Sequence, residues 1–261
     1  MNYTNLTSPM IENQSVFTDK ERARRTPPVV GLPTLKSVLA EIGSLPHEAL
    51  FLGLAEDGLP VLLNLYDPIP GPILVTADQS SGKTSLLQMI VRATEYTRSP
   101  AEVQFGVVTT DVDEWIQFQK SRIQAGIYDV HDDTTGELLK SLVTWAHNNK
   151  GDQQSILLFI DGLEEAIKLN DESEQNLRWL LLRGPSRRVW PFISLDASHA
   201  AELKDWMGFF RTRLFGRIQE TRVAASVTGK PDLPLADLAA GSQFCMHEGD
   251  HWLKFWIPPL D

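Results

Sequence analysis

The chain has 261 residues, 42% of them hydrophobic, which is enough for one large α/β domain with a substantial core. Its formal net charge of −10 argues against a surface that is basic throughout and coats nucleic acid, although a few positive loops could still contact DNA inside a ring. No apolar run approaches the roughly 20 residues of a membrane span, the N-terminus lacks the features of a secretory signal, and a single cysteine excludes a disulfide framework. We therefore expect a cytoplasmic protein with no membrane partner.

The N-terminal residues differ in character from the rest of the chain. Residues 1–28 are polar, end in a charged run and show no periodicity. We expect them to form a flexible arm ahead of a single domain over residues 29–261. The first elements of that domain are a short helix, predicted over 35–42 from its apolar spacing, and a β-hairpin, predicted from two apolar runs around Asp57-Gly58.

Strand and helix patterns then alternate. Continuous apolar runs predict strands over 73–76, 103–108, 156–160 and 192–195. Apolar residues at helical spacing predict helices over 83–94, 136–148 and 176–182. Buried strands that alternate with helices are typical of a mostly parallel sheet with helices on both faces, so the predicted fold class is α/β.

The C-terminal segment SQFCMHEGDHWLKFW predicts a second hairpin that turns at Gly249-Asp250. The letters from His247 to His251 also match HExxH, the zinc-protease motif, which requires a helix that presents both histidines on one face. Because the flanking residues favour strands, we interpret this segment as a hairpin and not as a zinc site.

The most informative segment is ILVTADQSSGKTSLL, from Ile73 to Leu87. An apolar strand, a turn of small and polar residues and then a helix beginning at Gly-Lys-Thr form the nucleotide-binding P-loop, with Ala77 in place of the first glycine. Lys83 is expected to reach the β- and γ-phosphates, and the Thr84 hydroxyl to ligate Mg²⁺. The predicted nucleotide-binding residues are Ala77, Asp78, Gln79, Ser80, Ser81, Gly82, Lys83, Thr84 and Ser85.

A second acidic motif supports the P-loop. SILLFIDGLEE places Asp161 at the end of an apolar strand. A carboxylate there can hold the water shell of Mg²⁺ opposite Thr84. ATP and Mg²⁺ are therefore the expected cofactors, with Thr84 and Asp161 as the metal-site residues.

The segment GLAEDGLPVLLNLYDPIPGPILVTADQSSGKTSLL resembles the motor domain of the FtsK/SpoIIIE and HerA group of ring-forming ATPases, in which a hairpin leads directly into the P-loop strand. Weaker similarities follow in the family's order, at VVTTDVDEW, GIYDVHDDTTGELLKSLVTWAHN, FRTRLFGRI and GSQFCMHEGDHWLKFWIP. The resemblance runs from Ala49 to Pro259. It implies a RecA-like P-loop NTPase fold, ATP hydrolysis, a homo-oligomer such as a hexameric ring, and the movement of DNA or protein.

Several positions depart from the family pattern. Gly162 stands where the family carries the glutamate that activates water, so Glu164 and Glu165 are the predicted catalytic carboxylates. Ser80 stands where glycine is usual, which restricts the loop if a positive φ is needed there. The segment that aligns with the family's polar sensor is LDASHAAEL, so Asp196, Ala197 or Ser198 occupies the sensor position.

A cluster of arginines, Arg183, Arg187 and Arg188, stands where a ring neighbour could donate an arginine finger, and the predicted catalytic arginines are Arg183 and Arg187. Two functions therefore remain open. One is an ATP-driven motor for DNA or protein; the other is a nucleotide-binding assembly module with little or no hydrolysis. A scaffold that has lost nucleotide binding is disfavoured by the intact Gly82-Lys83-Thr84.

Overall fold

A ten-stranded sheet runs through the described residues of the computed structural model, which are 32–149, 154–230, 233–248 and 251–261. The arm predicted over residues 1–28 lies outside these ranges and stays a prediction. The sheet belongs to the unit Pro33–Asp261, and its strand order is β2-β1-β10-β9-β8-β3-β7-β6-β4-β5.

The parallel part of the sheet contains the P-loop strand. Strand β3 (Ile73–Ala77) lies between β7 (Val189–Asp196) and β8 (Thr212–Phe215), parallel to both. Beyond β7, strands β6 (Ser155–Asp161), β4 (Val103–Thr109) and β5 (Gln124–Asp129) continue in parallel. The predicted α/β class with a mostly parallel sheet is confirmed.

The antiparallel part begins beyond β8 and contains both predicted hairpins. Strands β1 (Ala49–Ala55) and β2 (Pro60–Asn64) pair around Asp57-Gly58. Strands β9 (Gln243–Glu248) and β10 (His251–Trp256) form the second pair, in which His247 stands opposite Trp252. The HExxH letters therefore lie on two strands and not on a helix, while the turn residues Gly249 and Asp250 lie outside the described ranges.

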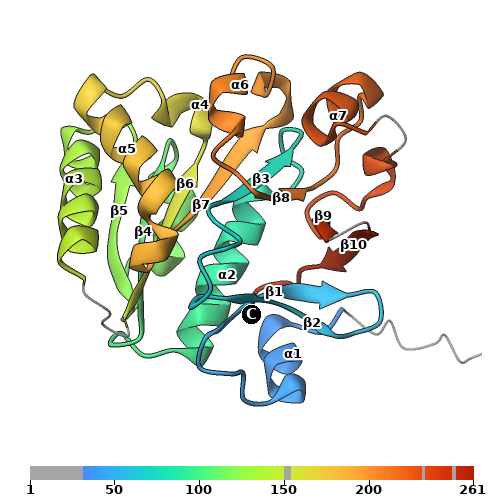
Figure 1. Ribbon diagram of the computed structural model, residues 1–261. Coiled ribbons are helices and arrows are strands. Elements are labelled where there is room, and N and C mark those ends of the chain that lie inside the picture. Colours follow the sequence, from blue (N-terminus) through green and yellow to red (C-terminus); the bar gives the residue numbers. More distant parts are fainter. Residues whose placement is uncertain (1–31, 150–153, 231–232, 249–250) are drawn as a thin grey trace, which may run out of the picture. The chain divides into compact units, whose positions relative to one another are not determined.

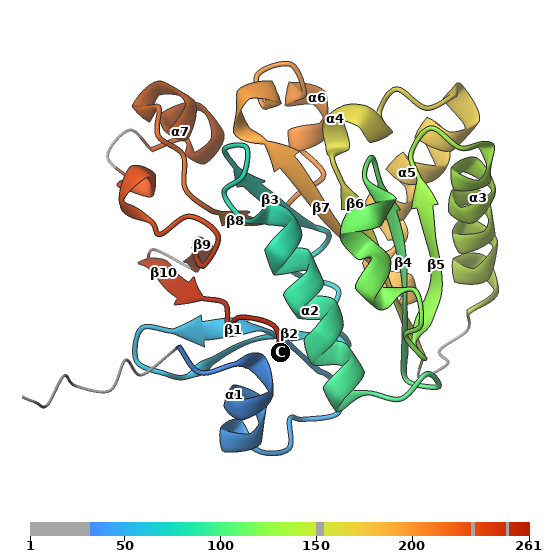
Figure 2. The ribbon, with the colours of Figure 1, turned by 180° about the vertical axis from the view of Figure 1, so that it is seen from behind.

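Helices cover the parallel strands on both faces. Alternate residues of β3 join different cores: Val75 belongs to a core shared with α1 (Leu35–Ile42) and α2 (Lys83–Thr97), and Leu74 to a core shared with the helices of the other face. Those helices include α3 (Asp133–Asn148), α5 (Asp171–Arg183) and α7 (Thr221–Thr228). Figure 1 shows α5 in front of the sheet, and Figure 2 shows α2 in front of the opposite face.

Some elements had no counterpart in the apolar patterns. The short helices α4 (Leu163–Ala166) and α6 (Lys204–Met207) follow β6 and β7, at the top of Figure 1. The chain ends beside its first helix, since the Leu35 amide donates to the carbonyl oxygen of Pro259 at 2.9 Å. Among the helices of the described part, none is both long and apolar enough to cross a membrane.

The C-terminal segment packs directly on the P-loop turn. The Gly241 amide donates to the carbonyl oxygen of Ser81 at 3.1 Å, and a Cβ placed on Gly82 would overlap with the Cα of Gly241. Gly82 also has φ +89°, a backbone conformation that side chains with a Cβ rarely adopt. Glycine is therefore required at position 82 for two independent reasons.

We expect Gly82→Ala to lower the free energy of unfolding by about 3 kcal/mol, because overpacking adds up to ~3 kcal/mol to a left-handed strain of ~1 kcal/mol. Gly229→Ala is the matched control, since Gly229 has φ +71° but no atom within 4 Å of its Cβ position. That control should lose only about 1 kcal/mol. Urea unfolding measures both; equal losses would contradict the close packing of Gly82 on Gly241.

The lone cysteine, Cys245, is buried on β9. Burial raises the pKa of its thiol to about 12, although the positive charge of Lys254 acts in the opposite direction. Since the thiolate is the reactive form, native protein at pH 8 should not react with Ellman's reagent, and one thiol per chain should react in denaturant. Rapid reaction of the native protein would show that this strand is not packed as described.

Candidate functional site

A polar cavity of about 1010 Å³ opens where the P-loop meets the carboxyl ends of the parallel strands. Its lining from the P-loop consists of Asp78, Gln79, Ser80, Gly82, Lys83, Thr84 and Ser85. The other lining residues lie at the ends of β4, β6 and β7, directly after these strands, or in the loop before β9. They are Thr109, Thr110, Asp111, Glu114, Asp161, Gly162, Glu164, Glu165, Ser194, Asp196, Ser198, His199 and Gly241. Of the predicted nucleotide-binding residues, Ala77 and Ser81 are buried under the loop instead of lining the cavity.

The P-loop turn is tied to the segment after β8. The Asp78 amide donates to the carbonyl oxygen of Arg217 at 3.0 Å, and the Asp78 carboxylate accepts from the Gln219 amide at 2.8 Å. Within the turn, the Ser81 amide donates to the Asp78 carbonyl oxygen at 3.2 Å. These hydrogen bonds fix the loop between β3 and α2.

Ser80 has φ +57°, in the left-handed region. In the family that the sequence resembles, glycine is usual at this position. The positive φ explains that preference, because glycine adopts it without strain. A residue with a Cβ costs about 1–2 kcal/mol in that conformation. Ser80 lines the cavity, and backbone outliers of this kind are common in functional sites.

Lys83 is folded back over its own loop. Its Nζ donates to the carbonyl oxygens of Ala77 and Asp78, at 3.1 and 3.0 Å, and forms an ion pair with Asp196 at 3.4 Å. An ammonium group has three protons to donate, so all of them are engaged. Lys83 must exchange one of these partners to bind a phosphate.

Asp196 ends β7 directly beside Ala77, its partner in the β3–β7 register. Burial opposes ionisation of this carboxyl, but hydrogen bonds from the Ser198 hydroxyl and amide, together with the charge of Lys83, outweigh burial and lower its pKa. Asp196 is therefore ionised at neutral pH, and it holds the P-loop lysine by charge.

Asp161 ends β6 in the row of strand ends, in register with Thr109 of β4 and Ser194 of β7. The Ser194 hydroxyl donates to the Asp161 carboxylate at 2.7 Å, which fixes its orientation. Asp161 and Thr84 line the same polar cavity, and their role in holding a metal stays a prediction.

Glu114 is a cavity residue to which the sequence pattern gave no role. Glu114 is exposed as a whole residue, but partial burial of its carboxyl, and then the negative charges of Asp161 and Asp111, raise the pKa of that carboxyl, while a hydrogen bond from the Thr84 hydroxyl acts in the opposite direction. The signal that could have identified it was the acidic run DVDE directly after the β4 strand, since carboxyl ends of neighbouring parallel strands meet at one edge.

Both predicted catalytic carboxylates line the cavity, but in different states. Glu165 is paired with Lys168 at 2.6 Å. Glu164 has a buried Oε2 that finds no hydrogen-bond partner within the described part of the chain. Gly162 has φ +113°, so a glutamate at that position, as in the family pattern, would be strained even though its Cβ would meet open space.

The predicted catalytic arginines lie away from this cavity. Arg183 ends α5, and Arg187 belongs to a 3₁₀ helix, η2 (Pro185–Arg187), that leads into the start of β7. The cavity is at the other end of β7, roughly 23 Å along the strand. These arginines therefore cannot act on the cavity of their own chain.

Carboxylates outnumber cationic groups around the cavity, where Lys83 is already paired with Asp196. No cluster of three His, Cys, Asp or Glu side chains in the described ranges could hold a metal ion unaided. Thr84 and Asp161 do fit Mg²⁺ as a partner of a nucleotide, because Mg²⁺ prefers oxygen ligands and usually takes few from the protein and the rest from phosphates and water.

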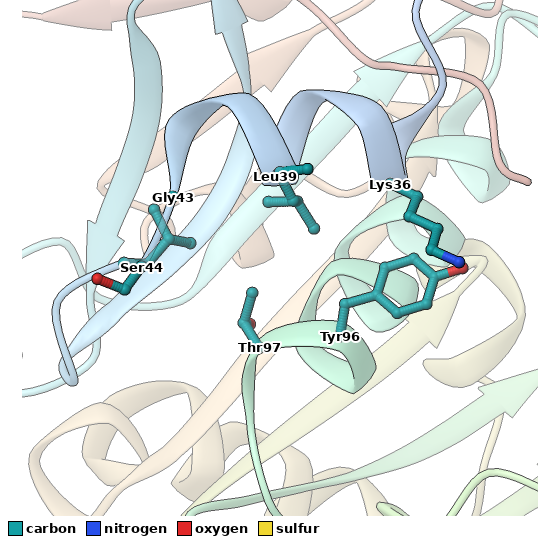
Figure 3. A pocket seen from close by; sticks show the side chains of 8 residues that line it. Lys36, Leu39, Gly43, Ser44, Tyr96 and Thr97 are labelled. Carbon is teal, nitrogen blue, oxygen red and sulfur yellow. The ribbon is translucent and has the colours of Figure 1, made fainter.

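A second cavity, of about 470 Å³, lies between α1 and the last turn of α2. Leu39 on α1 and Tyr96 and Thr97 on α2 border it (Figure 3). It is separated from the P-loop by the length of α2, roughly 20 Å, and is therefore distinct from the polar cavity.

No protein-family model and no curated protein matches the sequence. Solved structures do match. The cytoplasmic domain of the type VII secretion ATPase EccC from Thermomonospora curvata gives a TM-score of 0.71 at 16% identity, over 89% of this chain and 33% of that chain. EssC (ATPases 2 and 3) from Geobacillus thermodenitrificans also gives 0.71, at 12% identity, over 91% of this chain and 48% of that chain.

The pCW3 conjugation coupling protein TcpA, in its monomer form with ATPγS, gives a TM-score of 0.61 at 16% identity, over 83% of this chain and 67% of that chain. The chain spans between a third and a half of the EccC and EssC chains. At these identities the likeness shows the fold. The chain has the fold of the FtsK- and HerA-type P-loop ATPase domains, as the resemblance in its sequence implied.

Proposed function

We propose that this chain binds ATP together with Mg²⁺ in the polar cavity beside the P-loop. The observation that carries the proposal is that Lys83 and Thr84, from the start of α2, share one cavity with Asp161, from the end of β6. TcpA, which has the same fold, was solved with an ATP analogue. The turn amides and the N-terminal end of α2 would surround the phosphates.

Each residue has a distinct role in this proposal. Lys83 leaves Asp196 and binds the β- and γ-phosphates, while Thr84 and Asp161 hold Mg²⁺ and its water shell. When bound, Mg²⁺ supplies positive charge that offsets both the phosphates and the acidic lining. The other loop residues that line the cavity, Asp78 to Ser80, Gly82 and Ser85, would hold the phosphates through backbone and hydroxyl groups, while the buried Ala77 and Ser81 would support the loop.

We further propose that ATP is hydrolysed, slowly, to drive the movement of DNA or protein through a homo-oligomeric ring in the cytoplasm. Proteins of the same fold include a secretion ATPase and a conjugation coupling protein, so we propose both protein and DNA as candidate substrates. Glu164, with its unpartnered oxygen, and Glu165 are the proposed water-activating carboxylates. Arg183 and Arg187 would act on the cavity of a neighbouring copy.

The alternative is an assembly module that binds ATP but hydrolyses little of it. Two observations favour it: Gly162 stands in place of the family's catalytic glutamate, and Asp196, one of the three residues that align with the family's sensor, is paired with Lys83. Misplacing a catalytic group by about 1 Å can lower a rate by ~10²-fold.

Lys83→Ala should abolish the binding of a fluorescent ATP analogue in the presence of Mg²⁺, because it removes the positive charge nearest the phosphates. Lys140→Ala, which changes an exposed lysine of α3, is the control and should bind normally. Binding by Lys83→Ala at the wild-type affinity would remove the nucleotide site from this cavity.

Phosphate release, measured with and without double-stranded DNA, separates the two functions. Turnover that DNA stimulates supports the motor. Binding without release, with or without DNA, supports the assembly module.

Asp196→Asn should tighten ATP binding by about 10-fold, since it removes a negative charge beside the phosphate position and frees Lys83. Glu202→Gln is the matched control: it lies in the same segment after β7, but its side chain is exposed and does not line the cavity. Calorimetric titration measures both variants. Weaker binding by Asp196→Asn would mean that Asp196 holds Lys83 in its binding position instead of competing with the phosphate.

A further inference from the structure

Glu114 is held at the cavity by a rigid structural element. It belongs to a 3₁₀ helix, η1 (Val112–Phe118), whose start is capped by the Asp111 side chain. Trp115 and Phe118 lie on one face of this helix, three residues apart, and both are fully buried. Trp115 packs on Phe159 of β6 with ring centroids 6.2 Å apart. The backbone of Glu114 is therefore anchored to the same strand that carries Asp161.

Side-chain hydrogen bonds join η1 to α2 as well. The Gln88 side chain donates to the carbonyl oxygen of Glu114 at 2.9 Å and accepts from the Gln117 side chain at 3.3 Å. Gln88 lies four residues after Thr84, so the two residues share one face of α2. η1 is thus fixed over the face of α2 on which Thr84 lies.

The side chain of Glu114 shares the polar cavity with both metal-site residues, Thr84 and Asp161. Its negative charge therefore adds to that of Asp161 beside the Thr84 hydroxyl. Two carboxylates and a hydroxyl that line one cavity are an arrangement that a divalent cation would stabilise, because its charge offsets their repulsion.

We propose that Glu114 is a positioning residue for the metal, which orients the Thr84 hydroxyl and, with Asp161, holds the water shell of Mg²⁺. The proposal rests on the proposed function, since it concerns the Mg²⁺ that accompanies ATP. In this role Glu114 need not touch the metal. Outer-shell groups of this kind typically account for 10- to 100-fold in metal affinity.

The test is a Mg²⁺ titration of the full chain in the presence of a fixed concentration of a fluorescent ATP analogue. Glu114→Gln should raise the Mg²⁺ concentration at half-maximal binding by about 10-fold or more. Its affinity for the analogue in excess EDTA should equal that of the wild type. Glu114→Asp, which keeps the charge, should give an intermediate midpoint.

Asp113→Asn is the matched control. Asp113 is the neighbour of Glu114 on η1 and is exposed, but it does not line the cavity. This variant should keep the wild-type midpoint. Far-UV circular dichroism and urea unfolding of each variant verify that the fold is retained, which the exposed position of Glu114 favours.

The outcomes distinguish this inference from the proposed function. If the wild type shows no Mg²⁺-dependent binding, the proposed function fails and the role of Glu114 fails with it. If the wild type binds the analogue and Glu114→Gln has the same Mg²⁺ midpoint, only the role of Glu114 in positioning the metal is overturned. This holds even if the variant has lost ATP turnover. A loss of binding in EDTA would overturn it too, by showing that Glu114 shapes the loop and not the metal site.

Discussion

The parallel pairing of β3 with β7, and of β7 with β6 and β4 beyond it, is the constraint on which the site depends. Parallel strands end at the same edge of a sheet, so the register places Ala77 beside Asp196 at that edge. Two residues earlier on β7, Ser194 lies beside Asp161, which in turn lies beside Thr109. The P-loop leaves this edge at Ala77 and returns as α2. Because the strands are buried between helices on both faces, they position this edge rigidly, and the polar groups collect where the strands end.

The ion pair between Lys83 and Asp196 gives this site its particular character. Both side chains are mostly shielded from solvent, with exposures of 13% and 17%, so water screens their attraction little. Lys83 also donates to two carbonyl oxygens of its own loop. A nucleotide bound to Lys83 in the proposed way would displace Asp196, and the many carboxylates of the cavity would favour a divalent cation beside the phosphates.

Local patterns in the sequence were sufficient to predict the elements next to the P-loop. The helix over Leu35–Ile42, the hairpin around Asp57-Gly58 and the strand before the loop all have strong periodicity or turn signals. Strand β5 has none, because its residues are only partly buried and its letters, QAGIYD, form no apolar run. The helices α4 and α6 are too short to show a helical period.

The contacts within the site depend on strand order, which the sequence does not encode locally. Lys83 and Asp196 are 113 residues apart and meet only because β3 pairs with β7. Glu114 shares the cavity with Asp161 because β4 lies beside β6, and Arg187 lies far from the cavity because it enters β7 at the opposite end. The motif thus predicted which residues form the loop, whereas the register decides which groups surround it.

In the proposed function, the P-loop of this chain receives a nucleotide's phosphates by exchanging Asp196 for them at Lys83. A crystal structure of the chain with Mg²⁺ and ATPγS tests this exchange most directly. We expect phosphate oxygens within hydrogen-bonding distance of the Lys83 Nζ, with the Asp196 carboxylate no longer paired to it. A nucleotide bound elsewhere, with the pair between Lys83 and Asp196 intact, would contradict it.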